Sequence, residues 1–160
     1  MYGTSITEPE AKVSQTGRLC GLDGNSKMGK SLGNAIYLSD DAKTVSQKVM
    51  SAVTDTNRIS VKIPGNPDVC TVHTYHKVFN PQEVENICSM CKKAQIGCVA
   101  GKKLLAQRLN DILDPMREKR AELEKDRSIV RDIIKAGTAK ANEIGNATIS
   151  DIKEHMHVAI

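Results

Sequence analysis

The chain's 160 residues are 39% hydrophobic and 26% charged, with 23 Lys and Arg against 19 Asp and Glu, proportions typical of a globular protein. No apolar run approaches the roughly 20 residues of a membrane span, and the N-terminus lacks the basic and apolar regions of a signal peptide, so a cytoplasmic location is expected. With one Phe, three Tyr and no Trp, the core must come from aliphatic side chains, which favours packed helices.

Residues 1–38 are rich in Gly, Ser and Thr and contain a loop with two lysines. The short piece Arg18-Leu19-Cys20 is predicted to be a strand that ends in this loop. Residues 24–31 read Gly-Asn-Ser-Lys-Met-Gly-Lys-Ser, which fits the P-loop pattern G-x-x-x-x-G-K-[ST] of nucleotide-binding proteins. That fold needs a buried strand before the loop and alternating strands and helices after it, and this context is missing. A chance surface loop is the other alternative.

The first predicted helix is capped by Ser39 and runs to about Val53. The carboxylates of Asp40 and Asp41 would lie in its first turn, where they meet the positive end of the helix dipole. Its inner face consists of three apolar residues at helical spacing: Val45, Val49 and Ala52. The Pro-Gly-Asn-Pro sequence at 64–67 marks a connecting loop.

A second helix is predicted from Asn80 to about Ala94. Asn80 is a capping residue, Pro81 suits the first helical position, and Glu83 stands three residues after the cap. The Ile-Gly pair at 96–97 is expected to end this helix.

A third helix is predicted to begin near Val99, and Pro115 is expected to restart or kink it. Its apolar residues keep helical spacing: Leu104, Leu105, Leu109, Ile112 and Leu113. A last helical stretch is predicted from Ser128, with Gly137 and Gly145 weakening it without ending it. Its apolar positions are Ile129, Val130, Ile133, Ile134, Ala141, Ile144, Ile152 and Met156.

The net charge of +4 is concentrated in one stretch. Residues 92–135 hold 12 basic and 7 acidic side chains, while the rest of the chain holds 11 and 12. A basic stretch suggests a polyanion partner such as RNA. A solvated, salt-bridged helix face is the alternative.

Four of the five cysteines lie in one 29-residue window: Cys70, Cys88, Cys91 and Cys98. Disulfides are rare in cytoplasmic proteins, and three of these thiols share one stripe if a helix continues through Gly97. Four thiolates are enough for zinc or an iron–sulfur cluster, with His73 and His76 as candidate nitrogen ligands. Reduced cysteines that pack as small buried side chains are the alternative.

The flanks of the two-lysine loop resemble those of bacterial tryptophan–tRNA ligases. The shared segments near the loop are Tyr2-Gly3, Thr7-Glu8-Pro9-Glu10-Ala11, Gly17-Arg18-Leu19, Gly21-Leu22-Asp23-Gly24 and Ser31-Leu32-Gly33-Asn34-Ala35-Ile36. The resemblance continues at 69–70, 75–77, 96–98, 102–106 and 115–120, so it covers nearly the whole chain. In this family, residues 27–31 correspond to the Lys-Met-Ser-Lys-Ser loop of class I aminoacyl-tRNA synthetases.

The resemblance implies ATP-dependent ligation of tryptophan to its tRNA, with Mg accompanying ATP. Lys27, Lys30 and Ser31 would bind the ATP phosphates, and Lys30 would stabilise the activation transition state. The ATP-binding residues that the family implies are Leu19, Lys27, Met28, Gly29, Lys30 and Ser31. Gly29 stands where the family more often has Ser, which adds loop freedom but keeps both charges.

The resemblance also implies a mainly α fold in two parts. Residues 1–38 would be the end of a Rossmann-like catalytic domain, and residues 39–160 a helical anticodon-binding domain. The family's His-Ile-Gly-His-type signature and tryptophan pocket have no counterpart in the chain, which therefore matches the C-terminal part of the pattern and is not expected to aminoacylate alone. A homodimer is expected for the complete enzyme. The alternatives are a stand-alone tRNA- or iron–sulfur-binding module and, less favoured, a P-loop protein.

Two further sites follow from the resemblance. The helices after the loop would receive the tRNA anticodon, which makes eight basic residues candidate RNA contacts: Lys92, Lys93, Lys102, Lys103, Arg108, Arg117, Lys119 and Arg120. Some family members carry a four-iron cluster held by cysteines with a long gap, then a spacing of six, then of two. Cys70, Cys91 and Cys98 follow that order, but the fourth position is Gly101, and Cys88 would have to substitute for it.

Overall fold

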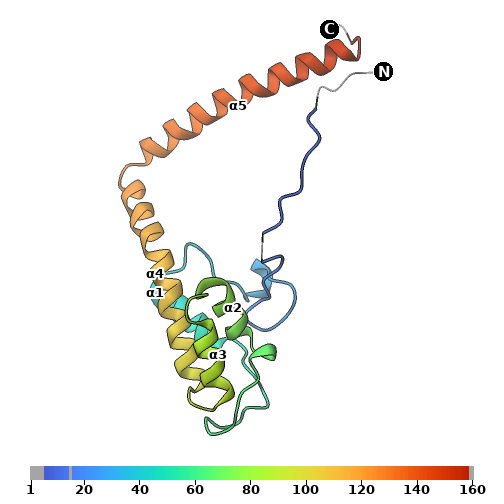
Figure 1. Ribbon diagram of the computed structural model, residues 1–160. Helices are drawn as coiled ribbons and strands as arrows, with labels where there is room; N and C mark the ends of the chain where they lie inside the picture. The colour runs from blue at the N-terminus through green and yellow to red at the C-terminus, as the bar shows by residue number, and fades with distance from the viewer. Residues whose placement is uncertain (1–5, 15, 159–160) are drawn as a thin grey trace. The chain divides into compact units, whose positions relative to one another are not determined.

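The computed structural model describes residues 6–14 and 16–158. All regular elements in this range are helices. They are the short 3-10 helices η1 (Lys30–Leu32) and η2 (Pro67–Val69) and the α-helices α1 (Ala42–Ser51), α2 (Thr71–Phe79), α3 (Val84–Lys92), α4 (Cys98–Lys125) and α5 (Arg127–His155) (Figure 1). The mainly helical expectation is confirmed. Tyr2-Gly3 lies outside the described residues.

The strand expected at Arg18-Leu19-Cys20 is wrong. The segment has no regular secondary structure, and the described residues contain no strand. It is held instead by a side chain, because the Tyr75 hydroxyl donates to the Cys20 carbonyl oxygen at 2.8 Å. Leu19 and Cys20 pack, half-buried, against the hydrophobic core.

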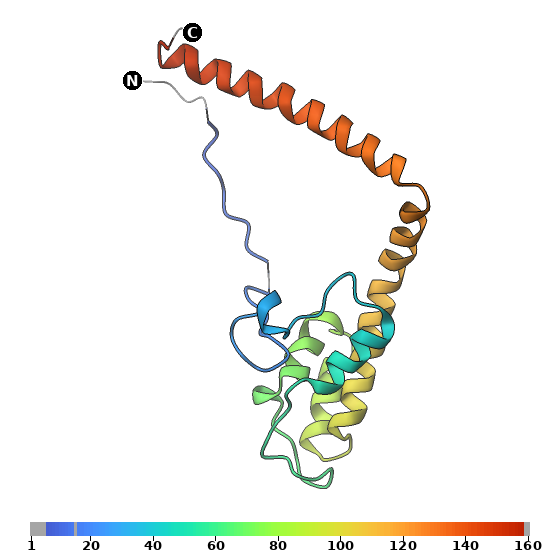
Figure 2. The same ribbon diagram turned by 180° about the vertical axis from the view of Figure 1, so that it is seen from behind.

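The chain divides into two compact units, Ser14–Lys119 and Met1–Val13 with Arg120–Ile160. The core of the first unit is built from α1, α2 and α4 together with Leu22 and with Ala52, the residue that follows α1. Figure 2 shows the backbone of this unit. Its buried residues are Leu22, Val45, Val49, Ala52, Val72, Tyr75, Leu105, Ala106, Leu109 and Leu113. The predicted inner face of the first helix is confirmed. In α4 the buried stripe runs through Leu105, Leu109 and Leu113, which leaves Leu104 partly exposed.

The helix starts differ in detail from those predicted. Asp41, not Ser39, caps α1, because its Oδ1 accepts from the Thr44 N–H at 2.6 Å. The first full helical residue after the Asn80 signal is Val84. The helix α2 has no side-chain cap at its preceding residue, Cys70, so the capping signals used to find helix starts do not mark it.

The helix α2 meets α4 through His76, which is almost fully buried. Its Nε2 lies 3.0 Å from the Gly101 carbonyl oxygen, and since a carbonyl only accepts, Nε2 donates. Nδ1 then accepts from the Asn80 side-chain amide at 3.3 Å, and that amide also donates to Glu83 at 3.0 Å. This arrangement needs the neutral imidazole, and burial lowers the pKa of His76 in agreement with it.

The helix α4 continues through Pro115 instead of restarting there, at the cost of one backbone hydrogen bond. After it, Asp126 caps α5 by accepting from the Ser128 N–H at 2.9 Å. As predicted, Gly137 and Gly145 do not end this helix (Figure 1). No residue of α5 is buried. None of the described helices has the length and apolar character needed to cross a membrane.

Candidate functional site

The lysine loop, residues 27–31, is part of a longer loop, residues 22–34, whose two ends are hydrogen-bonded to each other. The two end residues, Leu22 and Asn34, are both buried. The Leu22 N–H donates to the Asn34 carbonyl oxygen at 2.9 Å, and the Val53 N–H donates to the Leu22 carbonyl oxygen at 2.8 Å. The base of the loop is therefore fixed to the core next to the end of α1.

The two lysines of the loop face solvent. Lys27, Lys30 and Ser31 are exposed, whereas Met28 packs against the core. Lys30 opens the short helix η1, which ends at Gly33 with a left-handed φ of 63°. Among the described residues, neither Lys27 nor Lys30 has a hydrogen-bonding or ion-pair partner for its ammonium group. Two uncompensated cations near each other on one anchored loop can attract a polyphosphate.

Gly29 is the position where the family more often has Ser, and its surroundings can accept that side chain. Its backbone is extended, with φ −160° and ψ 151°. Among the described residues other than its chain neighbours, a Cβ atom there would meet the Leu32 side chain alone, at 3.7 and 3.8 Å, an ordinary contact. The structure therefore does not require glycine at this position.

Gly29→Ser should keep the free energy of unfolding unchanged or raise it by up to about 1 kcal/mol, because a residue with a side chain loses less backbone entropy on folding. Urea denaturation of both chains measures this difference. Gly33→Ser is the matched control and should destabilise the chain, because its positive φ strains a side-chain-bearing residue. A Gly29→Ser chain less stable than the Gly33→Ser chain would contradict the prediction.

The cysteine region is organised around an arginine. Arg58 Nη1 lies 3.6 Å from Cys91 Sγ and 3.9 Å from Cys98 Sγ. The same guanidinium donates to three backbone carbonyl oxygens, those of Ile63 at 2.7 Å, Val61 at 3.0 Å and Ile96 at 2.8 Å. Arg58 thus ties the loop after α1 to the turn between α3 and α4.

The residues present do not fit a metal cluster. Cys70, Cys88, Cys91 and Cys98 are free thiols, and no group of three or more His, Cys, Asp or Glu within residues 6–14 and 16–158 is arranged to hold a metal ion. A guanidinium stands beside two of the thiols, and His76 is engaged by α4 and Asn80. In the metal-free chain, burial raises the pKa of the thiols of Cys70 and Cys91. These observations support reduced, structural cysteines.

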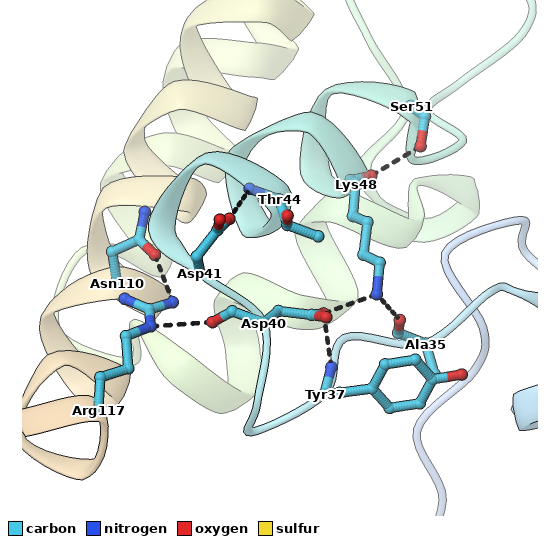
Figure 3. A network of polar contacts seen from close by, with 9 residues as sticks. All are labelled: Ala35, Tyr37, Asp40, Asp41, Thr44, Lys48, Ser51, Asn110 and Arg117. Atoms are coloured by element: carbon cyan, nitrogen blue, oxygen red, sulfur yellow. Dashed lines mark hydrogen bonds and ion pairs between the residues drawn. The ribbon is translucent and has the colours of Figure 1, made fainter. Parts of the chain in front are cut away.

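The basic residues proposed as RNA contacts fall into two groups. Several of them are engaged within the chain. Arg117 donates to the Asp40 carbonyl oxygen and to Asn110 Oδ1, each at 2.9 Å (Figure 3). Lys102 donates to the Met50 carbonyl oxygen at 2.8 Å, Arg108 donates to the Phe79 carbonyl oxygen at 3.3 Å, and Arg120 pairs with Glu124 at 2.8 Å. Lys119 also has a partner. Lys92, Lys93 and Lys103 are exposed and make no hydrogen bond or ion pair with the described residues.

The segment that follows the lysine loop is held by a residue that the sequence did not single out. Lys48 Nζ lies 2.6 Å from Asp40 Oδ2 and 3.0 Å from the Ala35 carbonyl oxygen (Figure 3). It also sits 4.3 Å above the centre of the Tyr37 ring. Since Arg117 holds the Asp40 backbone, this network connects the loop's return segment with α1 and α4.

Comparison with known proteins identifies the family of the chain. A family model described as "tRNA synthetases class I (W and Y)" matches residues 5–114. The tryptophan–tRNA ligase of Aquifex aeolicus is 36% identical over 160 residues, covering 99% of this chain and 40% of that protein. That of Borreliella burgdorferi is 42% identical over 149 residues, covering 91% of this chain and 42% of that protein.

Solved structures give the same answer. The tryptophanyl-tRNA synthetase of Campylobacter jejuni, complexed with ADP and tryptophan, has a TM-score of 0.78 and 27% identity, covering 98% of this chain and 49% of that chain. The enzyme of Aeropyrum pernix has a TM-score of 0.57 and 26% identity over 69% of this chain. The chain spans less than half the length of these relatives. It belongs to the class I tRNA synthetases of the W and Y family, and its relatives there are tryptophan–tRNA ligases.

Proposed function

We propose that the chain supplies the ATP-phosphate loop and the tRNA-binding helices of an enzyme that attaches tryptophan to its tRNA. The observation that carries this proposal is the pair of exposed ammonium groups of Lys27 and Lys30, which have no partner among residues 6–14 and 16–158, on a loop closed against the core. Because the chain spans less than half of its relatives, the complete activity belongs to a longer enzyme. We place residues 1–38 at the end of its catalytic domain and residues 39–160 in its anticodon-binding domain, and we expect a cytoplasmic homodimer.

The proposed role of the loop is electrostatic. In amino-acid activation, the tryptophan carboxylate attacks the α-phosphorus of Mg-ATP, and the bond from that phosphorus to the bridging oxygen breaks. Negative charge builds up on the departing pyrophosphate, where cations held in place stabilise the transition state. Lys27 and Lys30 supply these charges, and the Ser31 hydroxyl can donate to a phosphate oxygen. The bound ADP of the Campylobacter jejuni relative supports an adenine nucleotide as the ligand.

The test is tryptophan-dependent exchange of pyrophosphate into ATP. The chain is combined with the portion of the Aquifex aeolicus ligase that it does not match, and exchange is measured with each part alone and with both. Exchange only in the mixture supports the proposal. Binding of tRNA with no exchange under any combination would point to a stand-alone tRNA-binding module instead.

The proposed RNA contacts are the three candidate lysines that have no partner within the described part of the chain. Lys92 and Lys93 border a groove of about 530 Å³ between α2 and α3, which Lys77 and His73 also line. Lys103 is exposed on α4. Mobile ammonium groups suit contacts with phosphates, which dominate affinity for nucleic acids.

Replacing Lys92, Lys93 and Lys103 with Ala should weaken binding of tRNA and reduce its salt dependence. Each lost phosphate contact lowers the slope of log affinity against log salt by about 0.7–0.9, so the slope should fall by about 2. Mobility-shift titrations over a range of salt concentrations measure it. A triple variant of exposed lysines on α5 (Lys135, Lys140 and Lys153) has the same net charge and is the control; an equal loss in both variants would indicate non-specific attraction.

A further inference from the structure

The side chain of Asn34 lies buried beneath the lysine loop, with 4% of its surface exposed. Its Oδ1 accepts a hydrogen bond from the Gly29 N–H at 3.0 Å. Its Nδ2 donates to the Lys27 carbonyl oxygen at 3.0 Å and to the two carboxylate oxygens of Asp23 at 3.0 and 3.1 Å. One buried side chain therefore holds the backbone on both sides of Met28.

These bonds set the path of the backbone between the two lysines. Lys27 is held through its own carbonyl group, and Lys30 follows directly after the held amide of Gly29. A side-chain amide can donate and accept at the same end, which neither a carboxylate nor an aliphatic group can do. Asn34 is itself fixed, since its carbonyl oxygen accepts from the Leu22 N–H at 2.9 Å.

A second observation shows how closely the side chains of Asn34 and Asp23 pack against Gly21. A Cβ atom on Gly21 would lie 2.2 Å from Asn34 Nδ2 and 2.6 Å from Asp23 Oδ1, far inside van der Waals contact. The Asp23 carboxylate is also held by the Asn25 N–H at 3.0 Å. Any side chain at Gly21 must therefore displace the Asn34 amide or the Asp23 carboxylate.

We propose that Asn34 is a positioning residue for amino-acid activation, one that holds the backbone of Lys27 and Gly29 so that both lysines meet the ATP phosphates. The inference rests on the proposed function of the lysine loop. Asn34 touches no phosphate and acts only through the backbone. Removing the Asn34 side-chain amide leaves both lysine charges in the chain, but the backbone that sets the distance between them is no longer held. The affinity for a polyphosphate therefore falls although the net charge is unchanged.

The experiment measures two quantities on the whole chain: hydrogen exchange of the Gly29 amide by NMR and the affinity for inorganic tripolyphosphate by calorimetry. Asn34→Ala should speed exchange at Gly29 and weaken the affinity about tenfold, the equivalent of one lost hydrogen bond. Asn34→Asp should also weaken it, because two carboxylates then face each other. The double variant Asp23→Asn, Asn34→Asp again pairs a donor with an acceptor between the two side chains and keeps an acceptor for the Gly29 N–H, but it has no donor for the Lys27 carbonyl oxygen. It should therefore bind tripolyphosphate better than Asn34→Asp and more weakly than the unaltered chain.

Gly21→Ala and Gly17→Ala form a matched pair of controls. Gly21→Ala should weaken tripolyphosphate binding as Asn34→Ala does. Gly17→Ala should not, since no described residue other than its chain neighbours has an atom within 4 Å of its added Cβ. The amides of Val49 and Leu105 report whether the core stays folded. If Asn34→Ala loses core protection, the double variant and Gly21→Ala decide the question.

The outcomes distinguish a failure of this inference from a failure of the proposed function on which it rests. Unchanged Gly29 exchange and unchanged affinity in Asn34→Ala overturn the inference alone. So does a double variant with an intact core that binds tripolyphosphate as tightly as the unaltered chain, because it lacks the donor for the Lys27 carbonyl oxygen. If the unaltered chain binds no tripolyphosphate, the proposed function of the loop fails, and the positioning role fails with it.

Discussion

Replacing Lys30 with methionine should lower the rate of ATP–pyrophosphate exchange by the complete enzyme about 10²–10³-fold, the usual effect of removing one preorganised group that stabilises charge in a transition state. Methionine keeps much of the length of the side chain and removes only its charge. Lys30 is exposed and has no internal ion pair among the described residues, so the change should not disturb folding. Exchange is measured with the missing part of the enzyme supplied.

The distribution of the loss between kcat and KM tests the assigned role. If Lys30 acts on charge that develops only in the transition state, kcat should fall and the KM for ATP should change little. Lys43→Met is the control, because Lys43 is also exposed and has no hydrogen-bonding partner in the described part of the chain. A Lys30→Met enzyme within threefold of the unaltered rate would refute a catalytic role for the loop.

Local sequence signals found the helices whose buried faces consist of aliphatic residues. The periodic apolar residues of α1 and α4 predicted their buried faces, because spacing of three and four residues places side chains on one stripe. The helix α2 was missed since its buried face includes His73 and His76, which do not look apolar in a sequence. His76 is buried because Gly101 and Asn80 satisfy both of its ring nitrogens, and those partners are visible only in the fold.

The lysine loop was recognisable from its sequence, but the residues that shape it were not. Asn34 contacts backbone groups five and seven residues away, and neither Asn34 nor these groups lie in a helix or strand whose pattern could predict the contact. Arg58 reaches Cys91 and Cys98 across 33 and 40 residues. The iron–sulfur hypothesis counted cysteines by spacing, and spacing alone cannot reveal a guanidinium beside them. The predicted boundary between a catalytic domain ending at residue 38 and an anticodon-binding domain beginning at residue 39 stays a prediction.

The contacts of Arg58 lead to the largest stability effect that we expect. Arg58→Met should reduce the free energy of unfolding of the unit Ser14–Lys119 by about 3 kcal/mol, because hydrogen bonds from charged groups contribute about 1.5–3 kcal/mol each and three carbonyl acceptors lose their donor. Only part of that sum should appear, since water reaches the exposed residues Val61 and Ile63.

Urea denaturation monitored by hydrogen exchange of the Leu105 amide measures this change in the free energy of unfolding. Far-UV circular dichroism is unsuitable because its signal would also include α5. The stability of Arg58→Lys should lie between that of Arg58→Met and that of the unaltered chain, because an ammonium group cannot reach three divergent carbonyl oxygens at once. Arg18→Met is the matched control, as the exposed Arg18 side chain makes no hydrogen bond with the described residues. If Arg58→Met is as stable as Arg18→Met, then the guanidinium does not hold the loop after α1 against the turn before α4, and the cysteines would have to provide that stability by packing alone.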